Sequence, residues 1–314
     1  MRVMVVGASG AIGSQLVPQL IARGHEVIGT FRSPGKAGWV RDHGAQPMAL
    51  DLLDKDAVRD AVSKSRPDAI IHEATDLADA GMSRSLDKQF AGTNRLRTEG
   101  TDNLLAAARH ARVQQLVAQS FAPYRYAREG GPVKTEDDPL DSNPPKLARQ
   151  TFAAMNHVDR AFLDGGGVVL RYGGFYGAPD KTSRAIRKRQ YPIIGSGSGL
   201  MPWIHLEDAA AATALALEHE GPALYNIVDD ESAPMSEWLP ALASAVGGKR
   251  PFRMPTWLGN MVMGAEMVTM SLDSRGASNA RAKRELGWTL RYPSWRQGFP
   301  ASYGQHASGV NALA

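Results

Sequence analysis

A glycine-rich turn near the start of the chain constrains the fold more than any other feature. Residues 3–6 (VMVV) are long enough for one buried parallel strand. Gly7, Gly10 and Gly13 follow at a spacing of three, and apolar residues then recur at helical spacing. The order of strand, glycine turn and helix distinguishes a dinucleotide-binding crossover from a chance cluster of glycines.

Each glycine has its own physical role in such a crossover. Gly7 allows the tight turn, Gly10 lets a diphosphate approach the backbone, and Gly13 lets the helix and strand pack closely. Free N–H groups at the helix start then face the phosphates, with the positive end of the helix dipole behind them. We therefore predict a dinucleotide site, and the alternative is a glycine-rich turn that binds no ligand.

The composition limits the other classes of site and partner. A chain of 314 residues fits one large α/β domain, or a main domain with a smaller companion. The absence of cysteine excludes disulfides and thiolate chemistry and is compatible with a reducing cytoplasm. We read no signal-peptide pattern and no apolar run of about 18–20 residues. Because the net charge is only +4 and the charges are interspersed, we do not expect nucleic acid as a partner. Together these features predict a cytoplasmic protein that binds a small molecule and no membrane.

The end of the second expected strand (residues 25–31) indicates the choice of cofactor. NAD sites usually place a carboxylate there for the ribose 2′-hydroxyl. This chain instead has Arg32 and Ser33 at that position. Because a guanidinium can bind a 2′-phosphate bidentately, we predict NADP(H) in preference to NAD. A solvated loop arginine is the alternative.

Alternating strands and helices predict the fold class. We expect further strands at 46–50, 68–73, 113–119, 168–171 and 223–228, and helices at 54–62, 90–109, 147–163 and 236–246. This alternation predicts an α/β protein, a Rossmann-type doubly wound parallel sheet with a smaller C-terminal substrate domain. Residues 1–172 would form the dinucleotide-binding domain, to which 203–228 return. Residues 173–202 and 229–314 would form the substrate-binding cap, and 129–145 a loop near the site.

Several short motifs occur in a specific order along nearly the whole chain. They are GASGAIG at 7–13, Asp51-Leu52, IIHEAT at 70–75, Asn94 with EGTDNLLAAAR at 99–109, Ser120, LRYGGFYG at 170–177, WIHLEDAA at 203–210 and RELGW at 284–288. Together they resemble the extended short-chain dehydrogenase/reductase family, in its epimerase/dehydratase branch. The resemblance implies a Rossmann domain followed by a C-terminal substrate domain.

The resemblance also implies a set of cofactor-binding residues. Gly7, Ser9, Gly10, Ala11, Ile12 and Gly13 would hold the diphosphate, Arg32 and Ser33 the adenosine phosphate, Asp51 and Leu52 the adenine, Ala74 and Thr75 the ribose, and Ser120 would lie near the nicotinamide.

The expected helix at 147–163 departs from the family pattern. Family members usually carry a Tyr-x-x-x-Lys there, in which the lysine lowers the pKa of an acid–base tyrosine. With Asp159 at the family's acidic position, Thr151 replaces the tyrosine and Met155 replaces the lysine. Threonine is a poor acid–base group near neutral pH and methionine carries no charge, so the usual machinery is absent.

Three interpretations follow from this loss. In the first, the protein is an NADP(H)-dependent oxidoreductase acting on a small carbonyl or alcohol. Ser120 hydrogen-bonds the reacting oxygen, and Tyr124 or Tyr126 moves the proton. The candidates for the supporting positive charge are Arg125, Arg128 and Lys146. In the second, the protein is a nucleotide-sugar epimerase or dehydratase with a retained cofactor. In the third, it is a catalytically silent NADP-binding sensor or regulatory protein.

Other clusters have structural readings that we favour over functional ones. His72 and Glu73 lack further ligands at a coherent spacing, so we expect no metal site. The basic run 184–189 is read as a solvated face, with binding of an anionic substrate as the alternative. The methionines of 254–270, with Trp257, suggest core packing; a hydrophobic substrate cap or a homodimer contact is the alternative.

Overall fold

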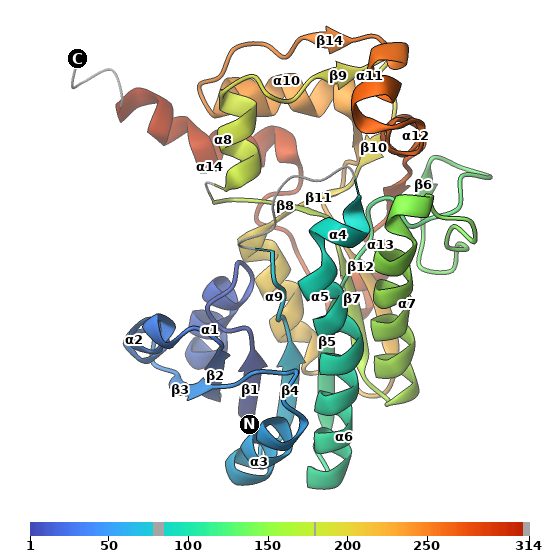
Figure 1. The fold of residues 1–314 in the computed structure, drawn as a ribbon. Coiled ribbons are helices and arrows are strands. Elements are labelled where there is room, and N and C mark those ends of the chain that lie inside the picture. The colour runs from blue at the N-terminus through green and yellow to red at the C-terminus, as the bar shows by residue number, and fades with distance from the viewer. Residues whose placement is uncertain (78–84, 179, 310–314) are drawn as a thin grey trace.

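The computed structural model describes residues 1–77, 85–178 and 180–309, and within them a seven-stranded parallel sheet forms the centre of the fold (Figure 1). In spatial order its strands are β12 (Ala223–Ile227), β7 (Val168–Tyr172), β5 (Gln115–Phe121), β4 (Ala69–His72), β1 (Arg2–Val6), β2 (Glu26–Phe31) and β3 (Gln46–Ala49). The strand order reverses between β1 and β4. In open parallel sheets, ligands bind outside the carboxyl ends of the strands at such a reversal.

The sheet is covered by helices on both faces. One face packs against α1 (Gly13–Ala22), α2 (Ala37–Asp42) and α9 (Leu206–Ala216). The other packs against α3 (Lys55–Ser65), α6 (Thr101–Ala111) and α7 (Arg149–Asp164). The strand β1 shows why: Val3 and Val5 enter the first core, whereas Met4 and Val6 enter the second. A strand buried on both faces therefore reads as a continuous apolar run.

One expected helix, at 90–109, is interrupted. It consists of α5 (Ala91–Arg95), a π-helical turn at Leu96–Gly100, and α6. A short helix, α4 (Leu86–Gln89), precedes it. π-helical turns widen the helix by one residue and are frequent at functional sites. A periodicity of 3.6 does not reveal such a turn, because the apolar face stays continuous across it.

The rest of the chain forms a smaller unit above the carboxyl ends of the strands (Figure 1). Its short strand pairs are β8 (Gly174–Tyr176) with β11 (Trp203–His205), β9 (Ile193–Ile194) with β14 (Arg253–Met254), and β10 (Leu200–Met201) with β13 (Ala233–Pro234). Its helices are α8 (Lys181–Arg187), α10 (Met235–Ala245), α11 (Thr256–Met263), α12 (Ala265–Asp273) and α14 (Trp295–Gly309). Aromatic side chains, including Trp203, Trp238 and Phe299, form its core.

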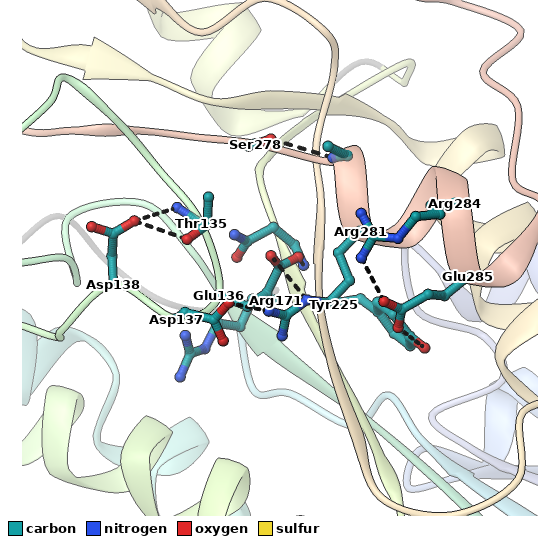
Figure 2. Close-up of polar contacts among 12 residues, drawn as sticks. Thr135, Glu136, Asp137, Asp138, Arg171, Tyr225, Ser278, Arg281, Arg284 and Glu285 are labelled. Carbon is teal, nitrogen blue, oxygen red and sulfur yellow. Dashed lines mark hydrogen bonds and ion pairs between the residues drawn. The ribbon is translucent and has the colours of Figure 1, made fainter.

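The expected loop at 129–145 is bound to the C-terminal region. Within it, β6 (Val133–Lys134) pairs with β15 (Gly276–Ala277), just before α13 (Ala280–Leu286). The buried Glu136 carboxylate accepts a hydrogen bond from the backbone N–H of Asn226 at 2.7 Å. Arg281 of α13 lies 3.8 Å from Glu136 and also pairs with Asp137 (Figure 2). The loop therefore covers the outer edge of the sheet at β12.

The predicted fold class is confirmed, and the seven expected strands are present. Residues 203–228 contribute β11, α9 and the sheet strand β12. The division into a dinucleotide-binding domain and a substrate cap remains our interpretation. None of the helices in the described part of the chain has the length and apolar character needed to span a bilayer.

The turn offers a test of the fold. A Cβ on Gly13 would overlap the backbone of the turn, at 2.6 Å from the carbonyl oxygen of Ala8. We expect Gly13→Ala to lower the free energy of unfolding by about 1–3 kcal/mol, as forced overpacking does. Gly38 lies exposed on α2 with open space around it. The matched control Gly38→Ala should raise stability by up to about 1 kcal/mol. Urea denaturation measures both, and a Gly13→Ala protein as stable as the wild type would contradict the packing argument.

Candidate active site

The backbone itself requires two of the three turn glycines. Gly7 has a φ of 95°, and a Cβ there would lie 2.9 Å from the backbone nitrogen of Ala74. A Cβ on Gly13 would overlap the backbone of the turn. Gly10 is exposed, and a Cβ there would lie 3.1 Å from the carbonyl oxygen of Gly7. The approach of a diphosphate to Gly10 therefore remains our prediction, whereas the close packing at Gly7 and Gly13 is observed.

The start of α1 has the chemistry of an anion site. Within the described residues, no side chain caps this helix start, and its first turn has no acidic residue. Ser9, Gly10 and Ala11 are accessible to solvent, while Ile12 is buried in the core and fixes the turn. Open N–H groups at a helix start favour a phosphate. The residues present therefore fit the diphosphate of a dinucleotide.

At the adenosine end, the predicted phosphate ligand has an acidic neighbour. The guanidinium Nη2 of Arg32 lies 2.8 Å from Oδ1 of Asp76, which follows β4. Ser33 is exposed beside it. Sequence reasoning missed Asp76, although its position just past Ala74 and Thr75 at the carboxyl edge of the sheet was a usable signal.

The other predicted adenosine contacts differ in accessibility. Asp51 is exposed, and its carboxylate accepts a hydrogen bond from the backbone N–H of Leu53 at 3.0 Å. The Leu52 side chain is buried in the core below α6. Ala74 and Thr75 are half-buried at the end of β4. Binding of cofactor by these four residues remains a prediction, and the burial of Leu52 limits it to a backbone role.

Ser120 lies in a buried charged network at the end of β5. Its Oγ accepts a hydrogen bond from Arg125 at 2.8 Å, and Arg125 also donates to Asn156 and Asp159. Arg171 donates to the same Asp159 oxygen at 2.8 Å. Burial alone would raise the pKa of Asp159, but the two arginines outweigh it and hold that pKa below its usual value. Ser120 is only 3% exposed, so its predicted contact with substrate requires that the side chains around it move aside.

The three candidate cations lie in different surroundings. Arg125 is buried against Ser120. Arg128 instead pairs with Asp141 at 3.6 Å, and Lys146 is exposed. Arg125 is therefore the candidate that lies beside the predicted catalytic serine.

Of the two candidate tyrosines, Tyr126 has its hydroxyl engaged on both sides. It donates to Asn226 at 2.6 Å and accepts from Arg171 at 3.4 Å. Burial raises its pKa. Tyr124 is half-buried, with a φ of 67° that a non-glycine residue rarely adopts. Such strain is concentrated at functional sites, and burial raises the pKa of Tyr124 well above its usual value. With its pKa raised, the Tyr124 phenol keeps its proton at neutral pH and is a weaker acid than an ordinary tyrosine, so the pKa alone supports neither role; both catalytic roles remain predictions.

The positions assigned to the missing Tyr and Lys have structural partners. The Thr151 hydroxyl donates to Asp87 at 2.9 Å and accepts from Asn94 at 3.0 Å. Met155 is buried in an apolar cluster with Met270 of α12. The first turn of α7 is therefore occupied by packing and helix-capping contacts, with Asp87 as a partner that the sequence did not reveal.

The His72–Glu73 pair is buried and uncharged at neutral pH. Burial lowers the pKa of His72 to about 4 and raises the pKa of Glu73 to about 8. The Tyr172 hydroxyl donates to Glu73 Oε1 at 2.9 Å and lies 2.6 Å from the Thr213 hydroxyl. In the ranges that the structure covers, no group of three or more His, Asp or Glu side chains could hold a metal ion.

The remaining clusters flank the site. The basic residues of 184–189 are exposed, although Arg189 donates to the carbonyl oxygen of Arg250 at 3.1 Å, and Ile186 between them is buried. On α11, Trp257 and Met261 are exposed, whereas Met267 of α12 packs against the same apolar cluster as Tyr124. The methionine-rich segment is thus divided between a surface helix and a helix that packs against this cluster.

Comparisons with known proteins agree with this geometry. The family described as NAD dependent epimerase/dehydratase matches residues 3–227. A 3-diazoavenalumate denitrifying reductase from a Streptomyces species is 39% identical over 308 residues, covering 95% of this chain and 99% of that protein. A 2-alkyl-3-oxoalkanoate reductase from Stenotrophomonas maltophilia is 29% identical, covering 80% of this chain and 77% of that protein. A human epimerase family protein solved with NADPH has a TM-score of 0.75 and 22% identity, covering 97% of this chain and 99% of its own.

Glu73 gives a pH-dependent test of the site. Because burial raises its pKa to about 8 in the folded state, the folded protein should lose stability as the pH rises from about 4.5 to 8. The loss is at most roughly 1.4 kcal/mol per pH unit. Glu73→Gln keeps a neutral group beside Tyr172, so we expect a stability gain over the wild type that grows across this range and then levels off.

Thermal unfolding at pH 5, 6, 7 and 8 measures that gain. The exposed Glu220 is the matched control, and Glu220→Gln should follow the wild type at every pH. A difference between Glu73→Gln and the wild type that stays constant with pH would show that Glu73 is ionised in the folded protein.

Proposed function

The chain belongs to the NAD-dependent epimerase/dehydratase family of extended short-chain dehydrogenases/reductases, and on that premise we propose that it is an NADP(H)-dependent oxidoreductase of a small organic substrate. The observation that carries the proposal is the uncapped start of α1, in the turn between Gly7 and Gly13, where open N–H groups suit a dinucleotide diphosphate. The relatives named as reductases support the reaction class.

The choice of NADP(H) is supported by Arg32 at the adenosine end of the crevice. The human structural neighbour solved with NADPH is consistent with it. In this arrangement the amides of Ser9 and Ala11 would bind the diphosphate, and Ala74 would lie along the ribose. Gly10, whose own N–H donates to the Gly7 carbonyl oxygen at 2.9 Å, would let the diphosphate approach. A reduced nicotinamide bound there supplies a hydride to the substrate.

A carbonyl is the first candidate for the group that is reduced. The 2-alkyl-3-oxoalkanoate reductase supports this class, since its name describes a 3-oxo substrate. A carbonyl oxygen must gain a proton as the carbon gains the hydride. With Thr151 and Met155 at the usual acid–base positions, the half-buried Tyr124 is the residue whose hydroxyl would donate it.

A diazo group is the second candidate, and the relative at 39% identity favours it. When a hydride adds to the carbon of an aryl diazonium, the C–N bond breaks and its electron pair leaves with N₂. The arene and N₂ are neutral products, so this replacement needs no proton donor. A site that has lost the tyrosine and lysine of its family therefore suits this chemistry.

The two candidates predict opposite behaviour of one variant. Tyr124→Phe should lower reduction of a 3-oxo ester by about 10²-fold or more, which is the usual contribution of a general acid. It should leave reduction of an aryl diazonium salt within about twofold, since no proton is transferred there. NADPH consumption and product mass, corrected for protein-free reactions, measure both.

Tyr292, a half-buried tyrosine of the C-terminal region, is the matched control, and Tyr292→Phe should change neither rate. Equal loss of both activities in Tyr124→Phe would remove the proposed role of Tyr124 as the proton donor. Binding of NADPH without consumption of it on either substrate would contradict the proposed oxidoreductase.

A further inference from the structure

The Arg32–Asp76 pair crosses the dinucleotide crevice. Strand β1 lies between β4 and β2, and all three are parallel, so their carboxyl ends share one edge. Arg32 directly follows β2, and Asp76 is in the segment that follows β4. Their 2.8 Å contact therefore joins the two sides of the edge at which the glycine turn leaves β1.

Asp76 is held by two contacts with helix α5. Its backbone N–H donates to the hydroxyl of the fully buried Thr93 at 3.0 Å. A Cβ on Gly92 of α5 would overlap the Asp76 carboxylate, so the carboxylate packs directly against this glycine. The Asp76 side chain is 29% exposed and the Arg32 side chain is 59% exposed, so the carboxylate is the more buried partner of the pair.

The positive charge of Arg32 and the negative charge of Asp76 would act in opposite directions on the 2′-position of the adenosine ribose, where NADP and NAD differ. NADP and NAD are distinguished by a 2′-phosphate that carries a charge of about −1.5 to −2 near neutral pH. Arg32 attracts that phosphate, but Asp76 neutralises the guanidinium and repels the phosphate. An acidic side chain can instead accept a hydrogen bond from the ribose 2′-hydroxyl of NAD.

We propose that Asp76 sets the preference between NADP and NAD by competing with the 2′-phosphate for Arg32. The inference rests on the proposed function, because it requires a pyridine dinucleotide in the crevice. The wild type would then bind NADP only moderately better than NAD, since the attraction of Arg32 is partly cancelled. Asp76 is a specificity-determining residue in this scheme.

Isothermal titration calorimetry of the full chain with NADP⁺ and with NAD⁺ tests the proposal. Asp76→Asn keeps the size of the side chain and removes its charge. We expect it to tighten NADP⁺ binding by about tenfold and to leave NAD⁺ binding within about twofold of the wild type or weaker. The gain should shrink at high salt, because exposed charges are screened.

Two further variants separate competition from a general charge effect. In an Arg32→Ala background, Asp76→Asn should improve NADP⁺ binding much less, since the competition has lost its target. Asp60→Asn, at an exposed acid of α3 that pairs with Lys64, should change neither affinity. Asp76→Ser serves as a second neutral variant if Asp76→Asn does not fold.

The outcomes are distinct. An NADP⁺ to NAD⁺ affinity ratio that is unchanged or lower in both neutral variants would overturn the role of Asp76 and leave the proposed oxidoreductase standing. A ratio raised equally with and without Arg32 would overturn the competition as well, because repulsion alone would then explain it. A wild-type protein that binds neither nucleotide would overturn the inference and the proposed function together.

Discussion

The structure depends on a close approach of three backbone segments at the end of β1. Gly7 touches the backbone that follows β4, and Gly13 touches the backbone that follows β1. Neither position tolerates a Cβ, so the start of α1 lies directly above the carboxyl ends of two strands. This contact positions the open N–H groups of α1 over the reversal of strand order, where an anion gains both hydrogen bonds and the helix dipole. The place of the helix start beside the crevice, and its anion-binding chemistry there, thus depend on one steric constraint.

The second constraint is the small number of charges that the interior retains. Asp159 is the buried anion between Arg125 and Arg171, while Glu73 and His72 are neutral at pH 7. Ion pairs of this kind keep their charge in the interior only when every partner stays in place, because an unpaired buried charge is strongly destabilising. A network that includes Ser120 therefore restricts what that serine can do. The charges around Ser120 are thus held rigidly in pairs, whereas Glu73 is a neutral buried acid with a pKa of about 8.

The sequence predicted the sheet and the turn because both rest on local patterns. Apolar runs give the strands, and three glycines between a strand and a helix give the crossover. The contacts that shape the site are not local. Arg32 meets Asp76 across 44 residues, and Glu136 meets Asn226 across 90, so their pairing depends on the strand order and not on spacing. Sequence reasoning could therefore name Arg32 but not its partner, since a charge pattern carries no distance in space.

The C-terminal region also contributes contacts to a site that lies mainly in the N-terminal half, and local sequence patterns did not reveal these contacts either. Tyr126 joins Asn226 of β12 to Arg171 of β7, and Arg171 joins them to Asp159. Glu136 extends the chain of contacts outward, since it accepts from the backbone of Asn226 and lies beside α13 (Figure 2). Each link is buried, and hydrogen bonds in a region of low dielectric constant reinforce one another. The position of the network around Ser120 is therefore coupled to the edge strand β12 and to helix α13 beside it, although no sequence motif connects them.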